Sequence, residues 1–151
     1  MIARAVPELE LDLPTTAIGK DYLGSAIVDA APSGSGVQLS LGGVVGRGMQ
    51  GEYGRARMTR IGPSLLLPDD APEVHDVWMS HFDGVTDAPD GFTVTAGTPG
   101  APVAVLENDE ERLYGVQFHP EVVHSPYGMA VLARFLHARA GIGADWEMSS
   151  V

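Results

Sequence analysis

The stretch GVQFHPE, residues 115–121, ends an apolar run with a histidine and a carboxylate that are two residues apart. Pro120 lies between them and stiffens the link, because its ring fixes the backbone φ angle. A histidine at the end of a strand can have its Nδ1 proton held by Glu121 while Nε2 faces a cleft, and such a histidine is a general base near neutral pH. The stretch therefore predicts His119 as a catalytic base and Glu121 as its orienting partner.

A base and its orienting carboxylate are two members of a nucleophilic triad, and the third member is an activated sulfur or oxygen. The chain of 151 residues contains 0 Cys, so the usual thiol is missing. Taken alone, residues 119–121 are also compatible with a surface histidine and glutamate on a strand-to-loop turn that have no catalytic role. The surrounding sequence must decide between the two interpretations.

Length and composition fit one soluble domain. A chain of 151 residues buries roughly two-thirds of its unfolded surface, and 44% hydrophobic with 19% charged residues is ordinary for a globular protein. No apolar run approaches the roughly 18 residues that span a membrane. Residues 1–13 contain a single base, Arg4, and alternate acids with leucines. We therefore expect neither a signal peptide nor a transit peptide, and we expect the protein to be cytoplasmic.

Charge and residue types disfavour several other classes of function. The formal net charge of -11 argues against nucleic-acid binding, which depends on clustered Lys and Arg. Without cysteine no disulfide or thiolate metal site can form, and the histidines lack the i, i+4 spacing of a helical zinc motif, so no metal is predicted. No phosphate-cradling glycine-rich loop precedes a helix, so we expect no cofactor and no ATP chemistry in this chain.

Alternation of polar and apolar residues between turn signals predicts short strands in the second half of the chain. The expected strands are 55–61, 73–79, 92–96, 103–106 and 113–118. Their close spacing indicates mostly antiparallel or mixed pairing. The first part of the chain is irregular, with a short strand and turn at 25–36 and a brief element at 37–41.

A helix is predicted from Ser125 to Arg139, packed against a face of the sheet. Ser125 can cap its N-terminus and Pro126 suits its first turn, while Gly141 is expected to end it. Its apolar face is formed by Val131, Leu132, Phe135 and Leu136.

Several separate motifs occur in a fixed order around the opening stretch. They are VWMSH at 77–81, PDGF at 89–92, GVQFHPEV at 115–122 and HSPYG at 124–128. In this order and spacing they resemble the class I glutamine amidotransferase domain of GMP synthase. The resemblance runs from about Leu41 to Trp146. Other class I amidotransferases share QFHPE, whereas WMSH and the last motif are similar to GMP synthase in particular.

The resemblance implies an α/β fold, a flavodoxin-like three-layer domain of the class I glutamine amidotransferase kind, incomplete at its N-terminal part. It also implies a reaction in which a cysteine attacks the side-chain amide of L-glutamine, with His119 as base and Glu121 as orienter. Ammonia then passes to an ATP-pyrophosphatase synthetase domain, which uses ATP and Mg²⁺ to convert XMP to GMP in purine biosynthesis. Ser80, His81 and Phe82 match the segment whose backbone lines the glutamine pocket, and Phe82 stands where the family usually has glycine.

The sequence departs from the family at the nucleophile. The family carries it on a strand-to-helix elbow, G-x-C-x-G-x-Q, and the corresponding residues 33–38 read SGSGVQ. Gly34 then takes the cysteine position, and the run to Leu41 is about one helical turn too short. We therefore expect residues 1–40 to be a degenerate or remodelled N-terminal part, from a frameshift or an internal deletion. Residues 41–151 are expected to be the C-terminal part of the amidotransferase domain, without the synthetase domain.

Three functional hypotheses remain open. The chain is an impaired amidotransferase of the GMP synthase type, a non-catalytic docking or regulatory module that binds an ATP-pyrophosphatase or GMP synthase subunit, or a hydrolase that uses Ser33 or Ser35 with His119. A hydroxyl is a poorer nucleophile than a thiol, and neither serine falls on the aligned position, which disfavours the third. Loss of the first strands would expose a sheet edge, so we also expect reduced stability or oligomerisation.

Overall fold

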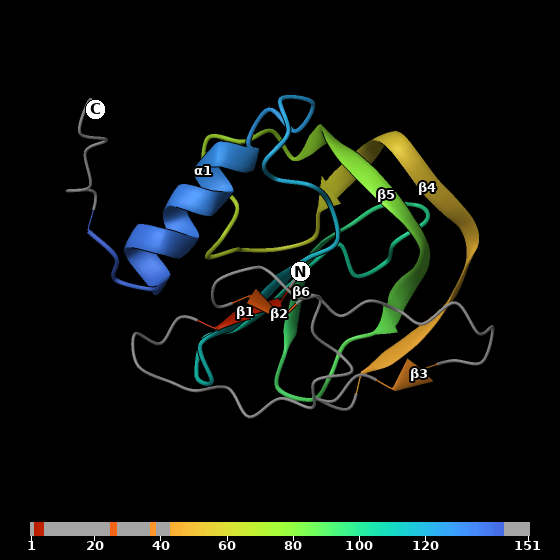
Figure 1. The fold of residues 1–151 in the computed structure, drawn as a ribbon, viewed down its shortest axis with the longest axis horizontal. Coiled ribbons are helices and arrows are strands. Elements are labelled where there is room, and N and C mark those ends of the chain that lie inside the picture. Colours follow the sequence, from red (N-terminus) through yellow and green to blue (C-terminus); the bar gives the residue numbers. More distant parts are fainter. Residues whose placement is uncertain (1, 5–24, 27–36, 39–42, 144–151) are drawn as a thin grey trace, which may run out of the picture.

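The fold is a twisted sheet with a helix at one side and a curled ribbon of two strands at the other (Figure 1). The computed structural model describes residues 2–4, 25–26, 37–38 and 43–143. Within these ranges the strands are β1 (Ile2–Arg4), β2 (Ser25–Ala26), β3 (Val37–Gln38), β4 (Val44–Arg60), β5 (Val74–Asp87), β6 (Thr93–Gly97), β7 (Val105–Asn108) and β8 (Leu113–Val116). The helical elements are α1 (Gly128–Ala133) and the π-helical η1 (Arg134–Arg139). The predicted strands and the predicted helix are all present, with different ends.

All strand pairs in the described residues are antiparallel, in agreement with the spacing of the strands in the sequence. The order across the sheet is β2-β1-β8-β7-β6-β4-β3, and β5 pairs with β4. At the end of β4, Thr59 and Arg60 pair with β6, while Thr59 also pairs with Val74 of β5. The ribbon of β4 and β5 therefore joins β6 at one corner, and β3 pairs with the opposite end of β4.

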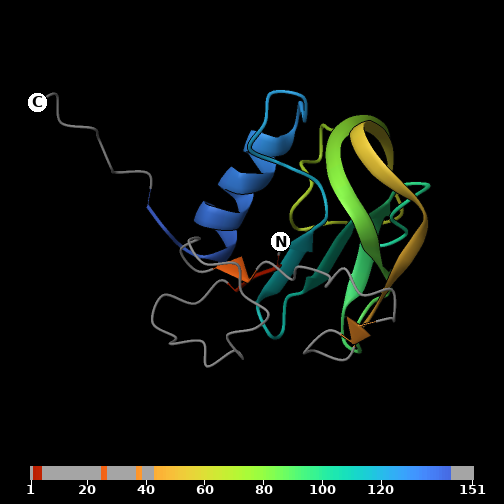
Figure 2. The same cartoon turned by 45° about the vertical axis from the view of Figure 1, so that its right-hand side comes forward.

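The ribbon is longer than the sequence predicts. β4 has 17 residues and β5 has 14, because their pairing continues as far as Val44 opposite Asp87. The register shifts between Arg47 and Glu52. A bulge of this kind bends a strand and increases its twist, and Figure 2 shows the ribbon curling over the sheet. Gly84 therefore lies inside β5, opposite Gly46 of β4.

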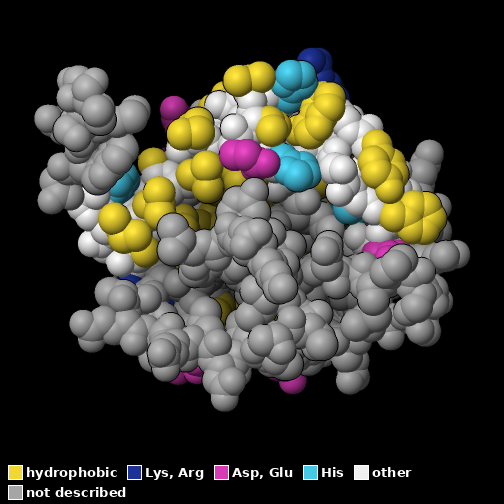
Figure 3. Space-filling view, in the orientation of Figure 1, with side chains coloured by type: hydrophobic (Ala, Val, Ile, Leu, Met, Phe, Trp, Pro, Cys, Tyr) yellow, Lys and Arg dark blue, Asp and Glu magenta, His cyan; other side chains and the backbone are white. Residues whose placement is uncertain are grey.

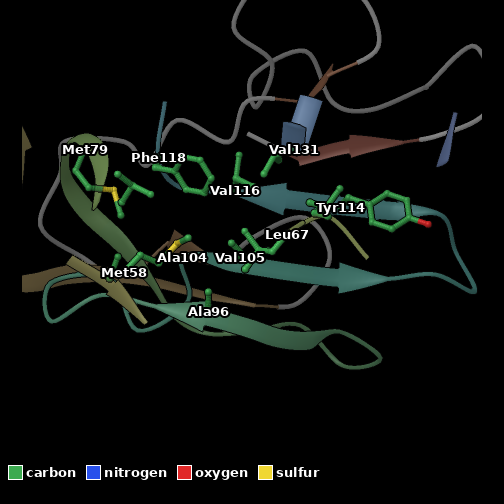
Figure 4. Close-up of a cluster of buried hydrophobic side chains, with 13 residues drawn as sticks. Met58, Leu67, Met79, Ala96, Ala104, Val105, Tyr114, Val116, Phe118 and Val131 are labelled. Atoms are coloured by element: carbon green, nitrogen blue, oxygen red, sulfur yellow. The ribbon is translucent and has the colours of Figure 1, made fainter. Parts of the chain in front are cut away.

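Buried apolar side chains form one core that joins the ribbon, the sheet and the helix (Figure 4). Met58 and Met79 reach it from the two strands of the ribbon, and Leu67 from the connection between those strands. Val105 belongs to β7, and Val131 is the contribution of α1. Because all five side chains are at most 3% exposed, the helix cannot separate from the sheet without opening this core.

α1 and η1 follow each other directly and begin at Gly128 rather than at Ser125. The residue before the helix, Tyr127, makes no capping bond with its side chain. The prediction that Ser125 caps the helix is therefore wrong, because its hydroxyl bonds with backbone groups of Trp78 and His119 instead. Gly141 follows the last turn with a φ of 72°, which favours glycine, and ends the helix as predicted.

The helix packs by a narrower face than the sequence predicts. Val131 is buried and Phe135 packs against the core, whereas Leu136 is 39% exposed. The wider turn of a π-helix shifts residues around the axis, which explains why Leu136 departs from the predicted face. Arg134 donates hydrogen bonds to Leu67 O (2.9 Å) and to the Asp69 carboxylate (2.6 Å). In the described residues no helix is long and apolar enough to cross a membrane.

Gly128 allows the start of α1 to lie directly against Pro120. A Cβ atom added at Gly128 would stand 1.9 Å from Pro120 O, and a backbone oxygen cannot give way as a flexible side chain can. Pro120 is itself fully buried. The helix therefore supports the segment that carries His119 and Glu121.

A polar cluster joins the end of the helix to the turn between β7 and β8. Tyr114 donates a hydrogen bond to Asp109, and Arg139 Nη1 lies 3.3 Å from Asp109 Oδ1. Burial and then the bond to Asp109 raise the pKa of Tyr114 to about 12. The same bond, with help from Arg139, lowers the pKa of Asp109. The turn and the helix are thus linked through groups that titrate.

Gly128→Ala is expected to lower the free energy of unfolding by about 2 kcal/mol or more, because the added methyl group collides with a rigid backbone atom. Denaturant unfolding measures the change. Gly62→Ala is the matched control, since no atom lies within 4 Å of a Cβ at that position; its effect should stay within about 0.5 kcal/mol. Equal stabilities of the two variants would contradict the contact between Gly128 and Pro120.

Tyr114 is expected to make the fold sensitive to alkali. Its folded pKa of about 12 exceeds the value of about 10 in an unfolded chain, so the neutral phenol favours the folded state. This stabilisation is complete below about pH 10 and is lost as the pH rises toward 12. Ultraviolet titration should show one late tyrosine, absent from Tyr114→Phe. A folded protein whose tyrosines all titrate near their free value would disprove the prediction.

Candidate active site

His119 and Glu121 lie side by side at the surface and are called the dyad below. His119 Nδ1 is 2.9 Å from Glu121 Oε1, and the two side chains are 43% and 55% exposed. A carboxylate can only accept, so this contact places the imidazole proton on Nδ1 and leaves Nε2 as the atom that can take a proton. Pro120 between them is buried, so the backbone is fixed while both side chains reach solvent.

The main chain carries the dyad from one part of the sheet to another. β8 ends at Val116, two residues before the predicted end of that strand. Gln117 N–H still donates to Ala104 O beside β7, whereas His119 N–H donates to Trp78 O in β5, both at 2.9 Å. Phe118 lies between these two bonds with its side chain in the core (Figure 4). This change of partner strand brings the dyad beside β5.

The Ser125 hydroxyl completes the contact with β5. It accepts from Trp78 N–H at 3.0 Å and donates to His119 O at 2.6 Å. The residue is only 4% exposed. Sequence reasoning missed this role because a serine before a helix has the pattern of a cap, and Trp78 is 47 residues away.

The Gln117 side chain also reaches β5. Its Oε1 accepts from Val85 N–H and its Nε2 donates to Asp83 O, both at 3.4 Å. These distances are long, so each bond is weak. The side-chain amide nevertheless offers one acceptor and one donor to two backbone groups of β5, as a peptide group of a neighbouring strand would. This accounts for the glutamine at position 117.

The three residues predicted to line a glutamine pocket follow one another in β5. Ser80 is exposed, Phe82 is 51% exposed, and the His81 side chain is only 7% exposed. Trp78, which holds His119, lies two residues before Ser80 on the same strand. The structure therefore brings the dyad and the predicted pocket segment to one strand.

The His81 side chain belongs to a buried polar network rather than to the surface. Its Nε2 is 3.2 Å from Glu52 Oε2, which also accepts from the Thr98 hydroxyl at 2.5 Å. The other oxygen of Glu52 accepts from Gly100 N–H at 3.2 Å. Glu52 thus ties β5 to the loop after β6, a role that sequence analysis did not assign because its partners lie 29 to 48 residues away.

Phe82 packs beside an aromatic neighbour at the bulge of the ribbon. A Cβ atom added at Gly51 would meet Phe82 Cδ2 at 3.0 Å and Tyr53 Cε2 at 3.2 Å, so the two rings flank this glycine. Tyr53 is 70% exposed. Figure 3 shows hydrophobic side chains gathering on the described surface over the helix and the ribbon.

Gly34, Ser33 and Ser35, the residues aligned with or adjacent to the expected nucleophile, lie outside the described residues. The segment expected to form the nucleophile elbow is therefore not part of the described site. Among the described histidines and acids, no group of three or more is arranged to hold a metal ion.

The chain is similar to one protein family and to enzymes of two mycobacteria. The model of the family "Glutamine amidotransferase class-I" matches residues 37–138. GMP synthase [glutamine-hydrolyzing] of Mycobacterium tuberculosis is 45% identical over 152 aligned residues, which cover 99% of this chain and 27% of that protein. The same enzyme of Mycobacterium leprae is 52% identical over 111 residues, 74% of this chain and 21% of that protein. The chain thus spans about a quarter of the length of these relatives.

A solved structure supports the same fold. The crystal structure of a "putative gmp synthase subunit a protein" from Thermoplasma acidophilum superposes with a TM-score of 0.61 and 27% sequence identity. The matched region covers 66% of this chain and 50% of that chain.

Proposed function

Since the chain belongs to the class I glutamine amidotransferase family, we propose that it is a glutamine-binding, ammonia-supplying domain of the GMP synthase type. Its substrate is L-glutamine. Its partner is an ATP-pyrophosphatase domain or subunit that converts XMP to GMP with ATP and Mg²⁺, in cytoplasmic purine biosynthesis. The mycobacterial and archaeal relatives support this assignment by their names.

The observation that carries the proposal is the contact of 2.9 Å between His119 Nδ1 and Glu121 Oε1. In a triad the base needs one nitrogen held by a carboxylate and the other free to exchange a proton with the nucleophile and the leaving group. His119 is the base in this proposal, and Glu121 orients it. The base would take the proton of a thiol that attacks the glutamine amide and return it to the departing ammonia.

β5 supplies the pocket in this proposal. His119 is bound through its backbone to Trp78, two residues before Ser80, so the base and the pocket segment keep a fixed separation along one strand. The backbone of Ser80, His81 and Phe82 would face the glutamine. The buried bond from His81 to Glu52 holds this backbone in place.

The reaction is impaired in this chain because the 151 residues contain 0 Cys. Loss of the nucleophile from a triad costs on the order of 10⁶ in kcat, as in subtilisin. Gly34 at the aligned position has no side chain that could attack. We therefore propose that the chain retains the base, its orienter and the glutamine pocket, and lacks the group on which they act.

L-Glutamine is expected to bind without being consumed. Amide chemical shifts of residues 80–82 should move on titration with millimolar L-glutamine, because the ligand would lie against their backbone. D-Glutamine is the matched control and should cause no comparable shift. If L-glutamine leaves residues 80–82 unchanged, the assignment to a glutamine-binding domain is wrong for this chain.

Ammonia release is expected to stay at background in the unaltered chain and to be the same in His119→Ala. A coupled ammonia assay with L-glutamine measures both. Robust release that disappears in His119→Ala would contradict the impaired reaction and would favour the hydrolase that uses Ser33 or Ser35.

A further inference from the structure

We propose that Ser125 is a positioning residue for the dyad: its hydroxyl joins the backbones of Trp78 and His119 and thereby fixes the direction in which the His119 imidazole meets Glu121. The functional meaning of this role rests on the proposed function, since His119 is the base there. The geometry itself rests on three hydrogen bonds among Trp78, His119 and Ser125. The two that the Ser125 hydroxyl makes are called the hydroxyl bridge below.

The hydroxyl bridge replaces one bond of a strand pair. In an antiparallel hydrogen-bonded pair, two opposite residues exchange both N–H···O bonds. His119 N–H donates directly to Trp78 O at 2.9 Å. The return bond is relayed, because Trp78 N–H donates to Ser125 Oγ at 3.0 Å and the hydroxyl donates to His119 O at 2.6 Å. Trp78 and His119 are therefore paired through a side chain.

Only a hydroxyl of this size performs the relay. The position needs an acceptor for Trp78 and a donor for His119 at the same time, and serine and threonine provide both on one atom. Alanine at this position would leave Trp78 N–H and His119 O without their partner. The position is buried, since Ser125 is only 4% exposed. Unpaired buried backbone groups are unfavourable, so the backbone of His119 would shift to find other partners.

The chain leaves β5 directly after His119, because the structure shows no further backbone bond from residues 120–124 to β5. The turn of residues 122–128 returns the chain to β5 instead. Ser125 N–H donates to Val122 O at 3.0 Å, and Gly128 N–H donates to Ser125 O at 2.9 Å, which fix the serine within the turn.

A ring contact supports the turn from the other side. The rings of Trp78 and His124 meet edge to face with centroids 4.4 Å apart. His124 directly precedes Ser125, so the same tryptophan that donates to the hydroxyl also packs against its neighbour. Glu121 lies between His119 and this anchored turn, so both members of the dyad depend on it.

The dyad cannot hold its own geometry. An ion pair or hydrogen bond between exposed side chains contributes little to stability, and His119 and Glu121 are 43% and 55% exposed. Such a contact exchanges readily with water. Its persistence requires that the two backbones be fixed independently, and the hydroxyl bridge does this for His119.

The test compares Ser125→Ala with Ser125→Thr in the full chain, by nitrogen NMR of the neutral His119 imidazole. In the unaltered protein and in Ser125→Thr we expect the Nδ1–H tautomer, because Glu121 accepts from Nδ1. In Ser125→Ala we expect loss of this preference while the spectrum stays dispersed. Thr86→Ala, which removes an exposed hydroxyl near the end of β5, should leave the tautomer unchanged.

A folded Ser125→Ala with the tautomer of the unaltered protein would overturn the proposal. If Ser125→Ala does not fold, Ser125→Cys replaces it, since a thiol is a weaker donor of similar size. A mixture of tautomers in Ser125→Cys supports the proposal, and an unchanged tautomer overturns it. The measurement uses no glutamine, so a failure of glutamine binding and a failure of the hydroxyl bridge give separate results.

Discussion

The pairing of His119 with Trp78 is the interaction on which the site depends. In the described residues β5 pairs on one side only, with β4, so its other edge would expose backbone groups. The QFHPE segment and the Ser125 hydroxyl cover that edge at Trp78. From the helix side, Gly128 allows α1 to support Pro120. The dyad is thus an exposed pair of side chains on either side of the buried Pro120, with both the N–H and the C=O of His119 hydrogen-bonded.

Much of this could be predicted from local sequence. Alternating residues located the strands of the second half, and the spacing of His119 and Glu121 indicated their contact. Ser125 could not be predicted, because a hydroxyl before a helix has the pattern of a cap whereas its actual partner, Trp78, is 47 residues away. The extension of β4 and β5 was missed because glycines that usually end strands lie within a bulged ribbon. The π-helical η1 likewise has no residue pattern that distinguishes it from an ordinary helix in the sequence.

The family explains why such a backbone is present in a chain without a thiol. Residues 37–138 match the class I glutamine amidotransferase model, and most of the described structure falls within that range. Core packing, the Glu52 network and the hydroxyl bridge do not involve the nucleophile. They can therefore persist in a chain with 0 Cys, because the free energy that stabilises them comes from burial and hydrogen bonding. Absence of a reactive group and retention of its supporting structure are physically compatible.

Hydrogen exchange at the Trp78 and His119 amides tests the central claim most directly. Both N–H groups lie outside the pairing of β4 with β5, so they are protected only if the QFHPE segment and Ser125 cover the edge of β5 as described. We predict protection of both amides comparable to that of the paired amides of β7 and β8. Exchange of either amide as fast as that of Val123, whose residue is 90% exposed, would contradict the pairing.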